Sequence, residues 1–168
     1  SLGAPETSIV LAADMTETKV KATSLDQYRV VHFATHGLLA GETSQLAKDN
    51  AEPSLVMTPP DTPTEHDDGL LTASEISSLK LNADWVVMSA CNTAGAGAPG
   101  AEALSGLAKA FFYAGARALL VSHWPVNSYA ATMLTSRTFA ELKQTPSMGR
   151  SEAFRRAMLA VMSDPKRP

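Results

Sequence analysis

Two residues in this sequence form a candidate pair for nucleophilic catalysis: His36 and the chain's single cysteine, Cys91. They are 55 positions apart (91 − 36). A thiolate is a strong nucleophile, and a neighbouring imidazolium lowers a thiol pKa from about 8.5 toward neutrality or below. The backbone amides of Gly37 and Cys91 are suited to bind a developing oxyanion, because a glycine leaves the approach open. The pair therefore predicts covalent attack on a carbonyl group.

Both residues follow predicted strands. Trp85–Met88 is a short run that is apolar on both faces and is stopped by glycines, which is typical of a buried central strand. Tyr28–Ala34 is rich in β-branched and aromatic residues and ends at Thr35-His36-Gly37. In an open α/β sheet, ligands and catalytic groups gather at the carboxyl ends of the strands. If the two strands are parallel, His36 and Cys91 lie at the same edge.

The segment after Cys91 supports a parallel arrangement. Leu104, Leu107, Ala108, Phe111 and Phe112 have the spacing of an amphipathic helix, and Gly115 stands where a left-handed cap belongs. Arg117–Ser122 is the next predicted strand. The whole segment is a strand-helix-strand crossover, which implies parallel neighbouring strands.

Other local signals complete the predicted secondary structure. Thr72 and Glu75 fit a capping box for a helix that runs to about Leu79. Two more helices are predicted over 128–143 and 150–162, and a weak strand or helix start over 8–12. We interpret the polar segment Gly41–Asp68, with its four prolines, as a long loop interrupted by a short strand at 55–57.

Composition limits the function classes. With 168 residues, 45% of them hydrophobic, we expect one domain spanning 1–168. The net charge of −3 without a basic block argues against direct nucleic-acid binding. No run of about 18 apolar residues and no leader pattern is present, so we expect no membrane partner. One cysteine makes a reducing, cytoplasmic compartment the default. No pair of His, Cys or Asp residues has the spacing of metal ligands, so we predict no metal site, and we expect no cofactor.

Several alternative readings of these residues remain. A lone cysteine after a buried strand can be an inert core thiol. Gly95–Gly100 reads G-A-G-A-P-G and matches a dinucleotide-binding motif. Two features weaken this match. The first glycine falls about four residues after Cys91 and not directly at the end of the strand, and the next strand ends at Ser122-His123, where a ribose-binding acidic residue would be expected. Among the other histidines, we interpret His32 as a packed strand residue and His66 as a solvated loop residue.

A family resemblance is carried by several blocks: H-F-A-T-H-G at 32–37, D-G-L-L-T-A-S-E-I at 68–76, S-A-C-N-T-A-G-A-G at 89–97, the stretch 106–121 and W-P-V at 124–126. Together they resemble the CHAT domain, a relative of caspases and separase that is usually attached to tetratricopeptide repeats or other sensor modules. The spacing from histidine to cysteine is also close to the roughly 50 residues of caspases. The resemblance implies a caspase-like three-layer α/β sandwich, with a mostly parallel central sheet and helices on both faces.

The same resemblance implies a cysteine endopeptidase that cleaves protein or peptide substrates through a dyad of His36 and Cys91, with Gly37 at the oxyanion position. The family commonly has Leu where His123 stands and Asp where Asn127 stands, so the pocket beside the nucleophile differs here. We take the candidate substrate-pocket residues to be Asp68, Ser122, His123 and Trp124. Asp68 favours a basic substrate side chain, and Trp124 leaves an apolar one open.

The family pattern continues past Pro168 with a hydrophobic strand, so we expect this chain to be part of a larger protein. We also expect low activity from the chain alone, with attached sensor or repeat domains ordering the Gly41–Asp68 segment. The alternative is a non-catalytic CHAT module that binds partner proteins. The intact His-Cys pair argues against that alternative.

Overall fold

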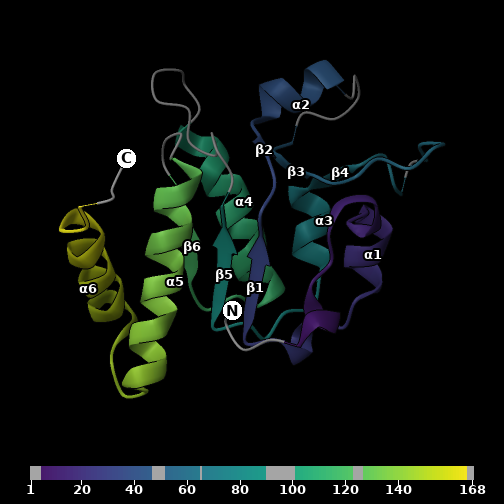
Figure 1. Ribbon diagram of the computed structural model, residues 1–168. Helices are drawn as coiled ribbons and strands as arrows, with labels where there is room; N and C mark the ends of the chain where they lie inside the picture. The colour runs from purple at the N-terminus through teal and green to yellow at the C-terminus, as the bar shows by residue number, and fades with distance from the viewer. Residues whose placement is uncertain (1–4, 47–51, 65, 90–100, 123–126, 166–168) are drawn as a thin grey trace. The chain divides into compact units, whose positions relative to one another are not determined.

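The structure, a computed structural model, describes residues 5–46, 52–64, 66–89, 101–122 and 127–165 (Figure 1). The chain divides into two compact units. One unit is Val10–Pro125, which contains both β-sheets. The other combines Ser1–Ile9 with Val126–Pro168 and contains two long helices. The residues proposed for chemistry fall in the first unit.

A three-stranded parallel sheet forms the centre of the first unit (Figure 1). Its strands are β1 (Val30–Phe33), β5 (Trp85–Met88) and β6 (Leu119–Val121), in the order β1-β5-β6. Phe33 lies opposite Met88, which in turn lies opposite Val121. Both pairings are parallel, so the prediction from the crossover segment is confirmed.

The main core lies between one face of this sheet and the helices α3 (Ala73–Ser78) and α4 (Ala101–Ala114). Phe33 packs on Phe111 of α4 with ring centroids 5.6 Å apart. Phe112, which the helical spacing placed on the core face, is instead 51% exposed, and the smaller Ala110 and Ala114 are buried in the α4 face. The predicted capping box of α3 is present, with reciprocal bonds between Thr72 and Glu75.

A second, antiparallel sheet follows the first strand. It consists of β2 (Gly37–Leu38), β3 (Ser54–Val56) and β4 (Leu70–Thr72), with Leu55 and Leu71 fully buried. The prediction of a long loop over 41–68 is therefore only partly right, because the segment also contains part of α2 (Ala40–Leu46).

Helix α2 has little of the apolar periodicity by which helices are recognised, and polar contacts hold it in place. A side-chain oxygen of Glu42 accepts a hydrogen bond from the Leu39 amide at 2.8 Å, which caps the start of the helix. The hydroxyls of Thr43 and Ser54, both fully buried, share a hydrogen bond of 3.1 Å that ties α2 to β3.

The sequence predicted the amino-terminal segment of the chain poorly. The weak signal over 8–12 gives no strand; 3₁₀ turns form at Glu6–Ser8 and Ala12–Asp14 instead. Helix α1 (Glu17–Ala22) then follows, with the Thr16 hydroxyl accepting from the Lys19 amide at 3.1 Å. The only local sign of α1 was a threonine before a single helical turn, and one turn carries almost no periodicity.

In the second unit, α5 (Ser128–Gln144) packs against α6 (Arg150–Met162), close to the predicted ranges. Ala153, Ala157 and Thr138 are buried in this pair. None of the described helices is long and apolar enough to cross a membrane. The mixed α/β architecture agrees with the predicted caspase-like fold, and the predicted helical layer on the other face of the parallel sheet stays a prediction.

Gly115 gives a direct test of the connection between α4 and β6. Its φ is +110°, as expected for the predicted left-handed cap, and a Cβ there would lie 2.3 Å from the Leu81 carbonyl oxygen. We therefore expect Gly115→Ala to lower the free energy of unfolding by about 2–4 kcal/mol. Gly41→Ala is the matched control, because nothing lies within 4 Å of a Cβ at this position in α2. Equal urea midpoints for the two variants would contradict this account of the cap.

Candidate functional site

The parallel pairing of β1 and β5 places the two predicted catalytic segments at one edge of the sheet. Phe33 and Met88 are register partners, and the Ser89 amide donates to the Phe33 carbonyl at 3.0 Å. His36 follows Phe33 by three positions, and Cys91 follows Met88 by three positions. Cys91 itself lies outside the described residues. The two segments therefore leave neighbouring strands at the same level.

The backbone on the histidine side is fastened to the antiparallel sheet. The Thr35 hydroxyl donates to the Val56 carbonyl, and the Val56 amide donates to the His36 carbonyl at 2.8 Å. The His36 residue is exposed and Gly37 is buried. These two bonds hold the His36 backbone against β3, so this segment does not rest on β1 alone.

The register of β2 also fixes the direction of the Gly37 amide. Gly37 lies opposite Leu55, and the bond from Val56 to His36 belongs to the neighbouring position of the ladder. In an antiparallel pair, hydrogen-bonded and non-hydrogen-bonded positions alternate. Gly37 therefore occupies a non-hydrogen-bonded position, and its N–H points away from β3. This direction is compatible with an oxyanion donor.

The candidate pocket residues near β6 are only partly described. Ser122 comes directly after Val121, the register partner of Met88, so it lies at the same carboxyl edge as Ser89. His123 and Trp124 lie outside the described residues. The structure thus places Ser122 on the predicted side of the sheet and leaves the other two as predictions.

Asp68 lies in the turn that precedes β4. Its Oδ1 accepts a hydrogen bond from the Leu70 amide at 2.9 Å, and its own amide donates to Glu17 at 3.1 Å. Following the register across β3, Asp68 is two strands away from β2, which is about 10 Å at the usual strand spacing. Its carboxylate thus organises its own turn, and its role in a substrate pocket stays a prediction.

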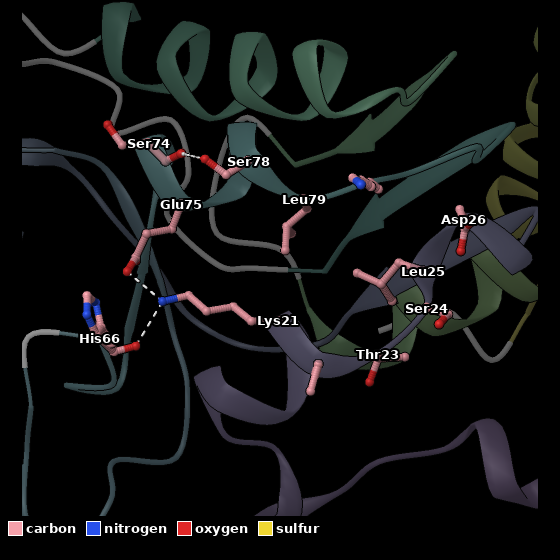
Figure 2. A pocket seen from close by; sticks show the side chains of 12 residues that line it. Lys21, Thr23, Ser24, Leu25, Asp26, His66, Ser74, Glu75, Ser78 and Leu79 are labelled. Atoms are coloured by element: carbon pink, nitrogen blue, oxygen red, sulfur yellow. Dashed lines mark hydrogen bonds and ion pairs between the residues drawn. The ribbon is translucent and has the colours of Figure 1, made fainter.

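A charged cluster that the sequence analysis missed lies beside this turn. Glu17 is only 1% exposed and forms an ion pair with Lys21. Lys21 also donates to Glu75 at 2.6 Å and to the His66 carbonyl at 2.9 Å (Figure 2). An ammonium group has three N–H donors, so all three are used. The second carboxylate oxygen of Glu17 accepts from the amides of Asp68 and Gly69.

Burial and hydrogen bonding act in opposite directions on the two carboxylates. Burial raises the pKa of Glu17 above its ordinary value, against the opposing effect of the Lys21 bond. Partial burial also disfavours ionisation of Glu75, but the bonds from Lys21 and from the Thr72 amide and hydroxyl together outweigh it and lower its pKa. Lys21 is therefore held between a carboxylate whose pKa is raised and one whose pKa is lowered.

The same cluster borders a surface groove of about 730 Å³ (Figure 2). Lys21, Leu25, His66, Glu75 and Leu79 are among the residues that line it, and His36, Asp68 and Ser122 are not. The groove is therefore separate from the carboxyl edge of the parallel sheet. Across the described part of the chain, no three acidic, histidine or cysteine side chains gather in a way that would hold a metal ion.

His32 differs from its interpretation as a simple packed residue. Its Nε2 is hydrogen bonded to the Ser89 hydroxyl at 2.8 Å, which links the ends of β1 and β5. Part of the residue is open to solvent, and desolvation of the remainder lowers the pKa of the imidazole. The sequence offered a weak signal for this pair, because both residues precede a candidate catalytic residue.

The buried Glu17 carboxylate is expected to anchor the turn at 68–69. Glu17→Ala leaves two backbone amides and one Lys21 donor without an acceptor, so we expect a loss of about 2–3 kcal/mol in the free energy of unfolding. Glu17→Gln keeps one acceptor oxygen and should lose about half as much. Urea denaturation of both variants measures this difference. A loss below about 0.5 kcal/mol in Glu17→Ala would show that the turn does not depend on this carboxylate.

Comparison with known proteins adds a family to this geometry. A search of the curated proteins finds no match. The family model described as the CHAT domain matches residues 1–168, the whole length of the chain. This match agrees with the parallel β1-β5 pairing and the mixed α/β architecture described above. The chain belongs to the CHAT domain family, a caspase-like family.

Proposed function

We propose that this domain is a cysteine endopeptidase in which His36 and Cys91 act as a catalytic dyad on protein or peptide substrates. The observation that carries the proposal is the register of β1 and β5. Phe33 and Met88 are partners in this register, and His36 and Cys91 each follow their own strand's partner by three positions. Family membership supports the same assignment.

The proposed reaction has two stages. The Cys91 thiolate attacks the carbonyl carbon of the scissile peptide bond, while the carbonyl π electrons move onto oxygen. The protonated His36 imidazole then gives its proton to the leaving amine as the C–N bond breaks, which leaves an acyl-enzyme. In the second stage, His36 takes a proton from water, and the hydroxide formed adds to the acyl carbon. The C–S bond then breaks, which releases the acyl group as a carboxylic acid and returns the Cys91 thiolate.

The oxyanion that forms in each stage requires preorganised N–H donors. We assign this role to the amides of Gly37 and Cys91. The direction of the Gly37 N–H supports this assignment, because it points away from β3 and is not used in that ladder. The absence of a side chain on Gly37 also leaves room for the substrate carbonyl.

Regulation is proposed to come from sensor or repeat modules in a larger protein. The segment 41–68, which these modules were expected to order, already contains regular secondary structure. The described part of 41–68 includes most of α2 and all of β3, and β3 already holds the His36 backbone. A regulatory module would therefore act on the cysteine side of the site more than on the histidine side. The alternative is a binding module without catalysis, which the dyad test below distinguishes.

The dyad makes a specific mutational prediction. We expect Cys91→Ala to abolish peptide cleavage and His36→Ala to lower kcat by about 10²- to 10⁴-fold, with little change in Tm, because both residues follow the ends of strands. His66→Ala is the matched control, since His66 is an exposed histidine outside the site. Cleavage of a fluorogenic peptide library measures activity. Turnover retained in purified Cys91→Ala would refute the proposed mechanism.

Substrate preference tests Asp68. We expect Lys or Arg before the scissile bond, and we expect the preference to fall about tenfold or more when the Asp68 charge is removed. Asp68→Asn is the informative variant because it keeps an oxygen for the Leu70 amide and so preserves the turn. Asp68→Ala removes both the charge and this turn contact. Library profiling that shows a Leu or Met preference unchanged in Asp68→Asn would refute the assignment.

A further inference from the structure

We propose that His32 and Ser89 form a positioning pair, whose hydrogen bond across the ends of β1 and β5 sets the separation of His36 and Cys91. This inference rests on the proposed function, because it concerns how the same dyad is held. Neither residue is assigned a place in the covalent steps. The pair acts through the backbone segments that carry the reacting groups.

The bond lies at the last shared level of the two strands. Ser89 is attached to β1 twice: its amide donates to the Phe33 carbonyl at 3.0 Å, and its hydroxyl is bonded to His32 Nε2 at 2.8 Å. Side chains alternate between the faces of a sheet. Phe33 and Met88 point into the main core, so His32 and Ser89 lie on the opposite face. The end of β5 is therefore attached to β1 both through the Ser89 backbone and through the Ser89 side chain.

Short chain segments connect this attachment to the reacting groups. Cys91 follows Ser89 by two positions, and His36 follows His32 by four. Two residues span at most about 7 Å, so the position of Ser89 limits where Cys91 can lie. A misplacement of about 1 Å can reduce catalysis about 10²-fold. On the histidine side, Val56 adds its own attachment, so the cysteine side depends more on this pair.

A serine bonded to a histidine is also the arrangement of an activated serine nucleophile. In serine hydrolases of that kind, the nucleophile's own amide often helps to bind the oxyanion. The Ser89 amide is already used in the bond to Phe33. Ser89 therefore lacks that donor, and the position after the strand that remains for a nucleophile belongs to Cys91. This is why we assign Ser89 a positioning role.

The single cysteine allows a direct test. Alkylation of the full chain by iodoacetamide, measured as a function of pH, reports the thiol pKa of Cys91 alone. We expect Ser89→Ala and His32→Leu each to raise this pKa by about one unit, which means about tenfold less thiolate below the pKa. The double variant should show no larger shift than either single variant, because the two side chains act as one unit.

Conservative variants separate positioning from loss of fold. Ser89→Thr keeps the hydroxyl, and His32→Gln keeps a hydrogen-bonding group at the end of the side chain. Both should retain the wild-type thiol pKa within about 0.3 units. All measurements are made well below each variant's Tm. A role limited to stability would lower Tm without moving the thiol pKa, and that result would overturn the inference.

His36→Ala distinguishes failure of this inference from failure of the proposed function. If His36→Ala raises the thiol pKa and Ser89→Ala does not, the dyad stands and the positioning role is refuted. If His36→Ala leaves the thiol pKa unchanged, the dyad is refuted and the positioning role with it. Labelling of Ser89 by a fluorophosphonate would also overturn the inference, because it would make Ser89 a nucleophile.

Discussion

The parallel pairing of β1 with β5 is the constraint on which the rest of the site depends. Phe33 and Met88 are partners in this pairing, and both are buried in the core beneath α3 and α4. Packing of Phe33 on Phe111 therefore supports the same level of the sheet at which the two proposed catalytic segments begin. Core packing and site geometry meet at these residues, so a change that loosens the core here would also move the site.

A second constraint comes from the antiparallel sheet. Its strand β3 receives the Thr35 hydroxyl bond and provides the amide that bonds the His36 carbonyl. At its far edge, β4 follows the turn that contains Asp68, and Glu17 holds that turn through its amides. The histidine side of the site is thus supported through β3 and β4 by a buried carboxylate on α1.

The sequence predicted features that depend on local signals. The two strands before His36 and Cys91, the capping box at Thr72 and the cap at Gly115 are all encoded within a few neighbouring residues, and the structure contains them. The Glu17 cluster could not be predicted in this way. Its contacts join residues about 50 positions apart, and a glutamate in a polar segment is normally solvent exposed. The bond between His32 and Ser89 is equally long in range.

The equal offsets on the two strands limit how the length of this chain can vary. An extra residue between Phe33 and His36, or between Met88 and Cys91, would advance one segment by about 3.3 Å relative to the other. Such an insertion would separate the proposed dyad of His36 and Cys91 without disturbing a core contact. Insertions between Leu38 and Ser54 leave both offsets intact. Relatives that keep the proposed chemistry should therefore differ in length between Leu38 and Ser54, and not within residues 33–36 or 88–91.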